Sequence, residues 1–138
     1  MSDGGKLAQS LESLCATAAQ LNKSSESMNA IFRSVEKALN EANIGLEVWV
    51  SDEEMAVGYA RYLHEWRLVI DRAGGVEEGT DEAHGGQGAD QYCPLHQATR
   101  KERIAAFQQL PRLLVALNEA AQHMLGTIQE AKSVIAWE

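Results

Sequence analysis

Residues 7–42 decide the fold; they read LAQSLESLCATAAQLNKSSESMNAIFRSVEKALNEA. Apolar side chains or alanine recur there in steps of four and three, Ser25 interrupts the series, and the span contains neither Pro nor Gly. The series is Leu7, Leu11, Leu14, Ala18, Leu21, Met28, Phe32, Val35, Leu39 and Ala42. Such spacing is typical of a long helix with one side against another helix. We predict a helix over residues 5–43, which Gly45 ends because glycine readily takes the left-handed closing conformation.

A second stretch near the C-terminus repeats this pattern. Thr99 and Glu102 have the spacing of a capping box, which starts a helix by satisfying its first free N–H groups. The apolar series that follows is Phe107, Leu110, Leu114, Leu117, Ala121, Met124, Ile128, Ala131 and Ile135. We predict a helix over residues 99–137, with a kink or short break near Pro111 because proline lacks an N–H and clashes with the preceding turn.

Between these helices, residues 46–72 change to a period of two. Apolar and polar residues alternate in three short runs with short connections, which favours a three-stranded antiparallel β-meander. Residues 73–98 follow as an acidic, glycine-rich segment without periodicity, which predicts a flexible loop. The expected fold class is α+β in one domain over residues 1–138. Two long helices of equal length form an antiparallel hairpin, and the meander is inserted between them.

The formal net charge is −8 in 138 residues, and the acidic excess belongs to residues 45–97. An acidic chain opposes duplex binding, which needs Lys and Arg against phosphates, so nucleic acid is an unlikely partner. There is no apolar run long enough for a membrane span, and the polar start argues against a signal peptide. Two distant cysteines, Cys15 and Cys93, are expected to be reduced thiols of a cytoplasmic protein.

Three residues come closest to a chemical site: His84, Cys93 and His96. The spacing of Cys93 and His96 allows both to bind one metal ion, but a structural zinc site needs four ligands. Nucleophilic catalysis by Cys93 would also need an orienting group and oxyanion donors, which no motif indicates. We therefore predict no catalytic residue, metal or cofactor. A small metal-dependent or thiol protein remains the alternative hypothesis.

Aromatic and arginine side chains gather in the predicted meander. Their composition resembles that of interface hot spots, although they could equally form the small core of the meander. The candidate interaction residues are Trp49, Tyr59, Arg61, Tyr62, Trp66 and Arg67.

Both helical stripes are wider than a two-stranded coiled coil requires, which favours a second copy as an additional neighbour. The predicted helix-interface residues are Leu14, Leu21, Met28, Phe32, Val35, Leu39, Phe107, Leu110, Leu114, Leu117, Met124, Leu125, Ile128 and Ile135. The leading hypothesis is a non-enzymatic interaction or adaptor module, a homodimer whose acidic head engages a protein partner. The order helix, three strands, helix resembles that of small acidic nucleoid-associated tweezer-like dimers, and acidic dimeric secretion chaperones offer a comparable analogy. That likeness implies a nucleic-acid-associated dimer as a further alternative, by topology alone.

Overall fold

The computed structural model describes residues 2–53, 55–72 and 92–135. It contains two long helices with an antiparallel sheet between them along the chain. The elements are α1 (Ser2–Glu41), β1 (Val48–Ser51), β2 (Ala56–Tyr62), β3 (Glu65–Asp71), β4 (Tyr92–Pro94), the 3-10 turn η2 (Leu95–Gln97) and α3 (Arg100–Ile135). The α+β class is confirmed. Most of the predicted flexible loop, residues 73–91, lies outside the described part of the chain.

Among the described residues the sheet has four strands in the order β1-β2-β3-β4, all antiparallel, so the prediction of three strands is corrected. The additional strand, β4, is only three residues long and contains Pro94, and both properties argue against a strand in a sequence. Proline is tolerated here because β4 lies at the edge of the sheet. The register pairs Pro94 with Val69 and Cys93 with Ile70.

One face of the sheet packs against both helices and forms the main core. Period-two alternation places Val57 and Tyr59 on this face, together with residues of the neighbouring strands. Its buried members from strands and helices are Met28, Phe32, Val48, Val50, Val57, Tyr59, Leu68, Ile70, Cys93, Ala106, Leu110, Leu113 and Leu117. A second buried cluster holds side chains of the other face: Trp49, Ala56, Ala60, Val69 and Tyr92.

The two helices run in the same direction where they meet, which corrects the antiparallel pairing expected from the sequence. Near the start of α3, Arg100 donates a hydrogen bond to Asn22 at 2.7 Å. Further along both helices, the rings of Phe32 and Phe107 meet edge to face with centroids 5.6 Å apart. Residue numbers thus rise together on α1 and α3.

The strand directions explain this parallel arrangement. Strands β1 and β3 both pair antiparallel with β2, so they point the same way. Helix α1 contacts β3, and α3 contacts the end of β1. In both contacts the residue numbers fall along the strand while they rise along the helix. Each helix is therefore antiparallel to its own strand, and the two helices are parallel to each other.

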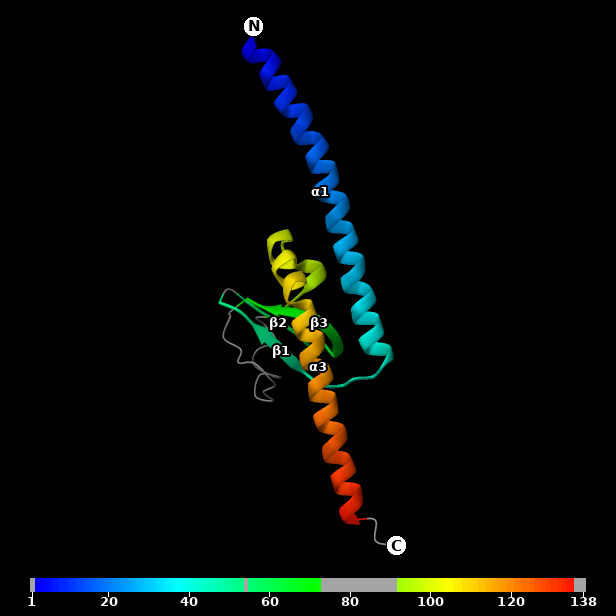
Figure 1. Ribbon diagram of the computed structural model, residues 1–138. Helices are drawn as coiled ribbons and strands as arrows, with labels where there is room; N and C mark the ends of the chain where they lie inside the picture. The colour runs from blue at the N-terminus through cyan, green and yellow to red at the C-terminus, as the bar shows by residue number, and fades with distance from the viewer. Residues whose placement is uncertain (1, 54, 73–91, 136–138) are drawn as a thin grey trace.

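Both helices are much longer than the sheet that they cover. A strand of seven residues spans about 23 Å, whereas helices of 40 and 36 residues span about 60 and 54 Å. Figure 1 shows the consequence: the first half of α1 projects beyond one end of the sheet, and the last half of α3 projects beyond the other. The two described chain ends consequently lie at opposite ends of the molecule.

Neither Pro111 nor the serine-rich stretch at residues 24–27 breaks its helix. Helix α3 continues through Pro111 from Arg100–Ile135, so the short break expected there is wrong. Helix α1 likewise runs without interruption through the serines of residues 24–27, and Ser25 is buried. Tertiary packing of one side of each helix outweighs the hydrogen bond lost at one proline and the low helix propensity of a few serines.

Candidate functional site

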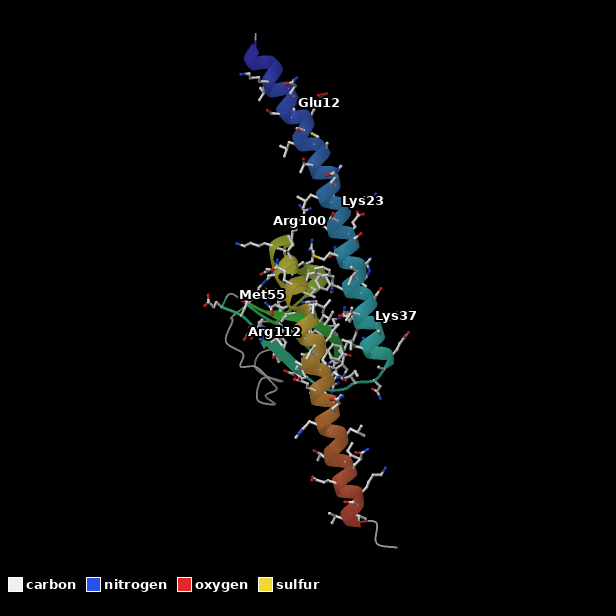
Figure 2. All side chains as sticks on the ribbon, in the orientation of Figure 1. Glu12, Lys23, Lys37, Met55, Arg100 and Arg112 are labelled. Carbon is white, nitrogen blue, oxygen red and sulfur yellow. The ribbon has the colours of Figure 1, made fainter. Side chains whose placement is uncertain are left out.

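The apolar stripe of α1 changes environment along its length. Met28 and Phe32 are buried against the sheet, with only 9% and 5% of their surface exposed. Leu11 and Leu14 continue the same side of the helix toward the N-terminus, yet they are 58% and 63% exposed. In Figure 2 the side chains around Glu12 project from a helix with no described element beside it. We call residues 4–22 the protruding half of α1.

Helix α3 is divided in the same way, but here the N-terminal part is buried and the C-terminal part is exposed. Leu113 is fully buried and Leu117 nearly so, whereas Ile128 is 49% exposed although it lies on the same side of the helix. We call residues 118–135 the protruding half of α3. Its exposed large apolar side chains are Met124, Leu125, Ile128, Val134 and Ile135.

The predicted helix-interface residues therefore fall into three groups. Met28, Phe32, Leu110 and Leu117 are buried in the core of the protomer, and Val35, Leu39 and Phe107 are half-buried against it. The remaining seven are exposed: Leu14, Leu21, Leu114, Met124, Leu125, Ile128 and Ile135.

Side chains of α1 close the part of the β3 edge that β4 does not reach. The Glu36 carboxylate accepts a hydrogen bond from the Leu68 backbone N–H at 2.7 Å. Asn40 donates its side-chain amide to the Trp66 backbone carbonyl at 3.2 Å. These contacts replace the bonds that a further strand would make, so this stretch of edge does not offer itself to an added strand. The Tyr59 hydroxyl also hydrogen-bonds Asn40, and burial together with nearby Glu36 raises the pKa of Tyr59.

A shallow groove of about 410 Å³ lies beside this closed edge, between α1 and the strand β3. Its polar lining consists of Asn29, Arg33, Glu36, Arg67 and His96. Glu36 is already engaged with Leu68, and its second oxygen lies 3.8 Å from the Arg67 guanidinium. The one carboxylate among the described residues of the groove is thus already engaged by Leu68 and Arg67, and Arg33 adds a second positive charge to the lining.

The predicted capping box at the start of α3 is confirmed, and its Glu102 also links the helix to the end of β3. Glu102 accepts from the Thr99 N–H at 2.9 Å, and the Thr99 hydroxyl accepts from the Glu102 N–H at 3.1 Å. The Arg72 guanidinium, just after β3, donates two hydrogen bonds to Glu102 at 3.1 and 3.0 Å. The bond with Arg72 is the main cause that lowers the pKa of Glu102, and the Thr99 bonds act in the same sense.

The turn between β2 and β3 presents an exposed leucine. Leu63 and His64 both have positive φ, at 50° and 73°, in a two-residue hairpin turn that normally selects Asn-Gly. Leu63 is 72% exposed. A leucine at positive φ costs backbone energy without any compensating burial, so the local fold does not explain its presence. Sequence reasoning missed this residue because its turn lacks the usual composition.

The candidate interaction residues of the head divide into core and surface. Trp49 and Tyr59 are each 1% exposed, which corrects their prediction as partner contacts. Gly58 makes room for the Trp49 ring, whose centroid lies 4.9 Å from that of Tyr92. The ring of Trp66 stacks on that of Tyr59 with centroids 5.2 Å apart. The predicted residues that keep accessible surface are Arg61, Tyr62, Trp66 and Arg67, which flank Leu63. We call these four with Leu63 the turn surface.

The candidate metal residues are not assembled in the described chain. His84 lies outside the described residues, Cys93 is buried and His96 is exposed. Among residues that the structure describes, no three His, Cys, Asp or Glu side chains gather as metal ligands. Burial raises the pKa of the Cys93 thiol, which disfavours the thiolate needed for nucleophilic attack.

In comparisons with known proteins, no family model, curated protein or solved structure matches this chain. In the described part of the chain, neither helix is apolar enough along its length to cross a membrane.

Proposed function

We propose that the protein is a non-enzymatic interaction module, which self-associates through the protruding halves of α1 and α3 and presents the turn surface to a protein partner. The exposed apolar stripes are the observation that carries the proposal. Leu11 and Ile128 continue stripes that are buried elsewhere in the same helices. Exposed apolar surface of this extent is typical of an interaction site.

Charge placement on the protruding halves supports an apolar interface. At 100° per residue, Glu12 lies on the side of α1 opposite Leu14, and Glu119 and Glu130 lie on the side of α3 opposite Ile128. The carboxylates of the protruding halves therefore face away from the stripes, whereas Lys132 lies one turn from Ile128 and borders the α3 stripe. This is the arrangement of a helix that buries one side against a neighbour.

Self-association is tested by sedimentation of the wild-type chain and of Leu11→Asp and Ile128→Asp over a range of micromolar concentrations. We expect the wild type to sediment as a dimer and each variant to weaken dimerisation at least tenfold, because a carboxylate would be buried without a partner. The matched control is Val134→Asp, which alters an exposed apolar residue on another face of α3. A wild type that remains monomeric, or equal weakening by the control, would contradict the proposal.

The partner contact is supported by the strained, exposed turn. Leu63 combines positive φ with high exposure, and the neighbouring Arg61 and Trp66 belong to residue types enriched at hot spots. The double variant Leu63→Asn and His64→Gly would relieve the strain while removing the apolar tip. A protein captured from the native host by the wild type should be lost with this variant, and a partner retained unchanged would exclude the turn surface.

A further inference from the structure

We infer that the occupant of both protruding halves is a second copy of this chain, in an arrangement where the protruding half of α1 packs antiparallel against the protruding half of α3 from the other copy. This inference rests on the proposed self-association and specifies its geometry. A single two-fold axis would produce two contacts of this kind, which together cover both stripes of both copies.

The directions of the helices lead to this arrangement. Because α1 and α3 are parallel and project from opposite ends of the sheet, the two halves of one protomer cannot cover each other (Figure 1). A two-fold axis perpendicular to the helices exchanges the two ends of the molecule. It would bring α3 of the second copy beside the protruding half of α1 and would reverse its direction. The same operation repeats the contact at the other end.

The lengths of the two halves match under this symmetry. The Phe32–Phe107 contact marks a common level on the two helices. From that level, the protruding half of α1 lies between about 15 and 42 Å away, and the protruding half of α3 lies between about 16.5 and 42 Å away, at 1.5 Å per residue. An axis at this level would therefore overlay the two halves along nearly their whole length, with no apolar overhang at either end.

The same construction gives a residue register. Leu14 lies eighteen residues before Phe32, and Leu125 lies eighteen residues after Phe107, so these two levels coincide across the copies. Met124, beside Leu125, is the residue at this level that continues the buried side of α3. The arrangement therefore predicts contact between Leu14 and Met124 of the second copy. It also places the two copies of Leu14 about 54 Å apart, since each stands 27 Å from the axis level.

Both contacts would contribute apolar side chains to the dimer interface. Each contact would join two protruding halves, each about 27 to 29 Å long, and the dimer contains two such contacts. Stable dimers commonly bury about 800 Å² per protomer with an apolar centre. The stripes supply large side chains for that centre from both helices: Leu7, Leu11, Leu14, Leu21, Met124, Leu125, Ile128 and Ile135.

Disulfide trapping tests the register directly. In a Cys15→Ser background, the variant Leu14→Cys with Met124→Cys is oxidised mildly and analysed on a non-reducing gel. We expect the band to shift from 15.1 kDa to twice that mass. Both positions are exposed in the protomer, so cysteine there leaves the fold intact, which circular dichroism verifies. Cys93 is buried and remains unchanged.

Three matched controls separate this arrangement from others. Leu14→Cys alone should stay monomeric on the gel, because linkage would show that two α1 helices pair. Met124→Cys alone should do the same for two α3 helices. Leu14→Cys with Ile135→Cys should not link, since that pair is offset by about 15 Å in the predicted register. Linkage in any of the three would overturn the inference.

The outcome also distinguishes this inference from the proposed self-association. If sedimentation shows a dimer but the Leu14–Met124 pair does not link, the exchange of helix halves is wrong while self-association stands. If the double variant neither sediments as a dimer nor links, and the wild type is also monomeric, both fail together.

Discussion

The packed and the protruding halves of the two helices carry the same pattern but have different surroundings. Leu113 and Ile128 occupy the same side of α3, as Phe32 and Leu14 do in α1. Leu113 and Phe32 are buried against the sheet, whereas Ile128 and Leu14 are exposed in the protomer. The difference arises from the sheet, whose strands of at most seven residues cannot cover helices of 36 and 40 residues.

This comparison shows that one periodic signal can specify two kinds of contact. The packed halves hold the protomer together, and their contacts should not depend on protein concentration. The protruding halves gain burial only by association, so their contribution to stability should rise with concentration. Substitutions matched across the two halves can therefore test the division.

The largest expected effect is at Leu113 in the packed half. Leu113→Ala should lower the free energy of unfolding by about 2–5 kcal/mol, because Leu113 is fully buried and truncation leaves a cavity. Urea unfolding followed by circular dichroism measures the change. The matched variant is Ile128→Ala, which should cost less than about 0.5 kcal/mol at concentrations where the chain is monomeric. An equal, concentration-independent cost for both variants would show that the two halves do not differ.

The sheet itself offers a second test of packing within the protomer. An added Cβ at Gly58 would lie 2.5 Å from the Trp49 ring and 2.8 Å from the Val48 carbonyl, so Gly58→Ala must displace one of them. We expect a loss of about 1–3 kcal/mol in unfolding free energy. Tryptophan fluorescence should also change because Trp49 is buried. Dimerisation should be unaffected if it depends only on the protruding halves.

Sequence reasoning predicted the two helices, their lengths and the first three strands because each follows a strong local period. The Thr99–Glu102 capping box is also predictable, because its whole signal lies within four consecutive residues. The strand β4 was missed because three residues with Pro94 carry no usable period. Its place depends on pairing with β3, which is a long-range property.

The relative direction of the two helices, and how far along each helix the apolar side is buried, could not be predicted from the sequence either. Apolar periodicity identifies which side of a helix is buried, but it does not say which element covers that side or for how far. Equal helix lengths suggested a hairpin, whereas α1 and α3 each align with a different strand of one sheet. For Trp49 and Tyr59 the sequence leaves interface and core equally open, because alternation alone does not show that both faces of a sheet contain buried side chains.

The β2–β3 turn should respond to substitution in the opposite sense from the core. Leu63→Asn with His64→Gly should raise the free energy of unfolding by about 1 kcal/mol, because these residues accept the positive φ that Leu63 and His64 now adopt. Thermal unfolding would show a higher midpoint. Sedimentation of the same variant should match the wild type, since the turn is not part of either protruding half. A lower midpoint would mean that Leu63 makes stabilising contacts in the folded chain.

The smallest effect concerns the charged contact that fixes the packed end of α3. Arg72 holds the pKa of Glu102 below its ordinary value, so the stabilisation is present above the unfolded pKa of about 4.3. It is lost as the pH falls through the lower, folded pKa. Because both side chains are partly exposed, Glu102→Gln should cost less than about 1 kcal/mol at pH 7 and should approach the wild type at low pH.

Thr99→Ala is the matched control for this last comparison. It removes the hydroxyl cap of the same helix turn and should cost about 1 kcal/mol with a much weaker pH dependence, because the Thr99 hydroxyl is the smallest of the contacts that lower the pKa of Glu102. Urea unfolding of the two variants at pH 7 and near pH 3 would separate the ion pair from the cap. A Glu102→Gln deficit that persists unchanged at low pH would show that the carboxylate acts only as a hydrogen-bond acceptor.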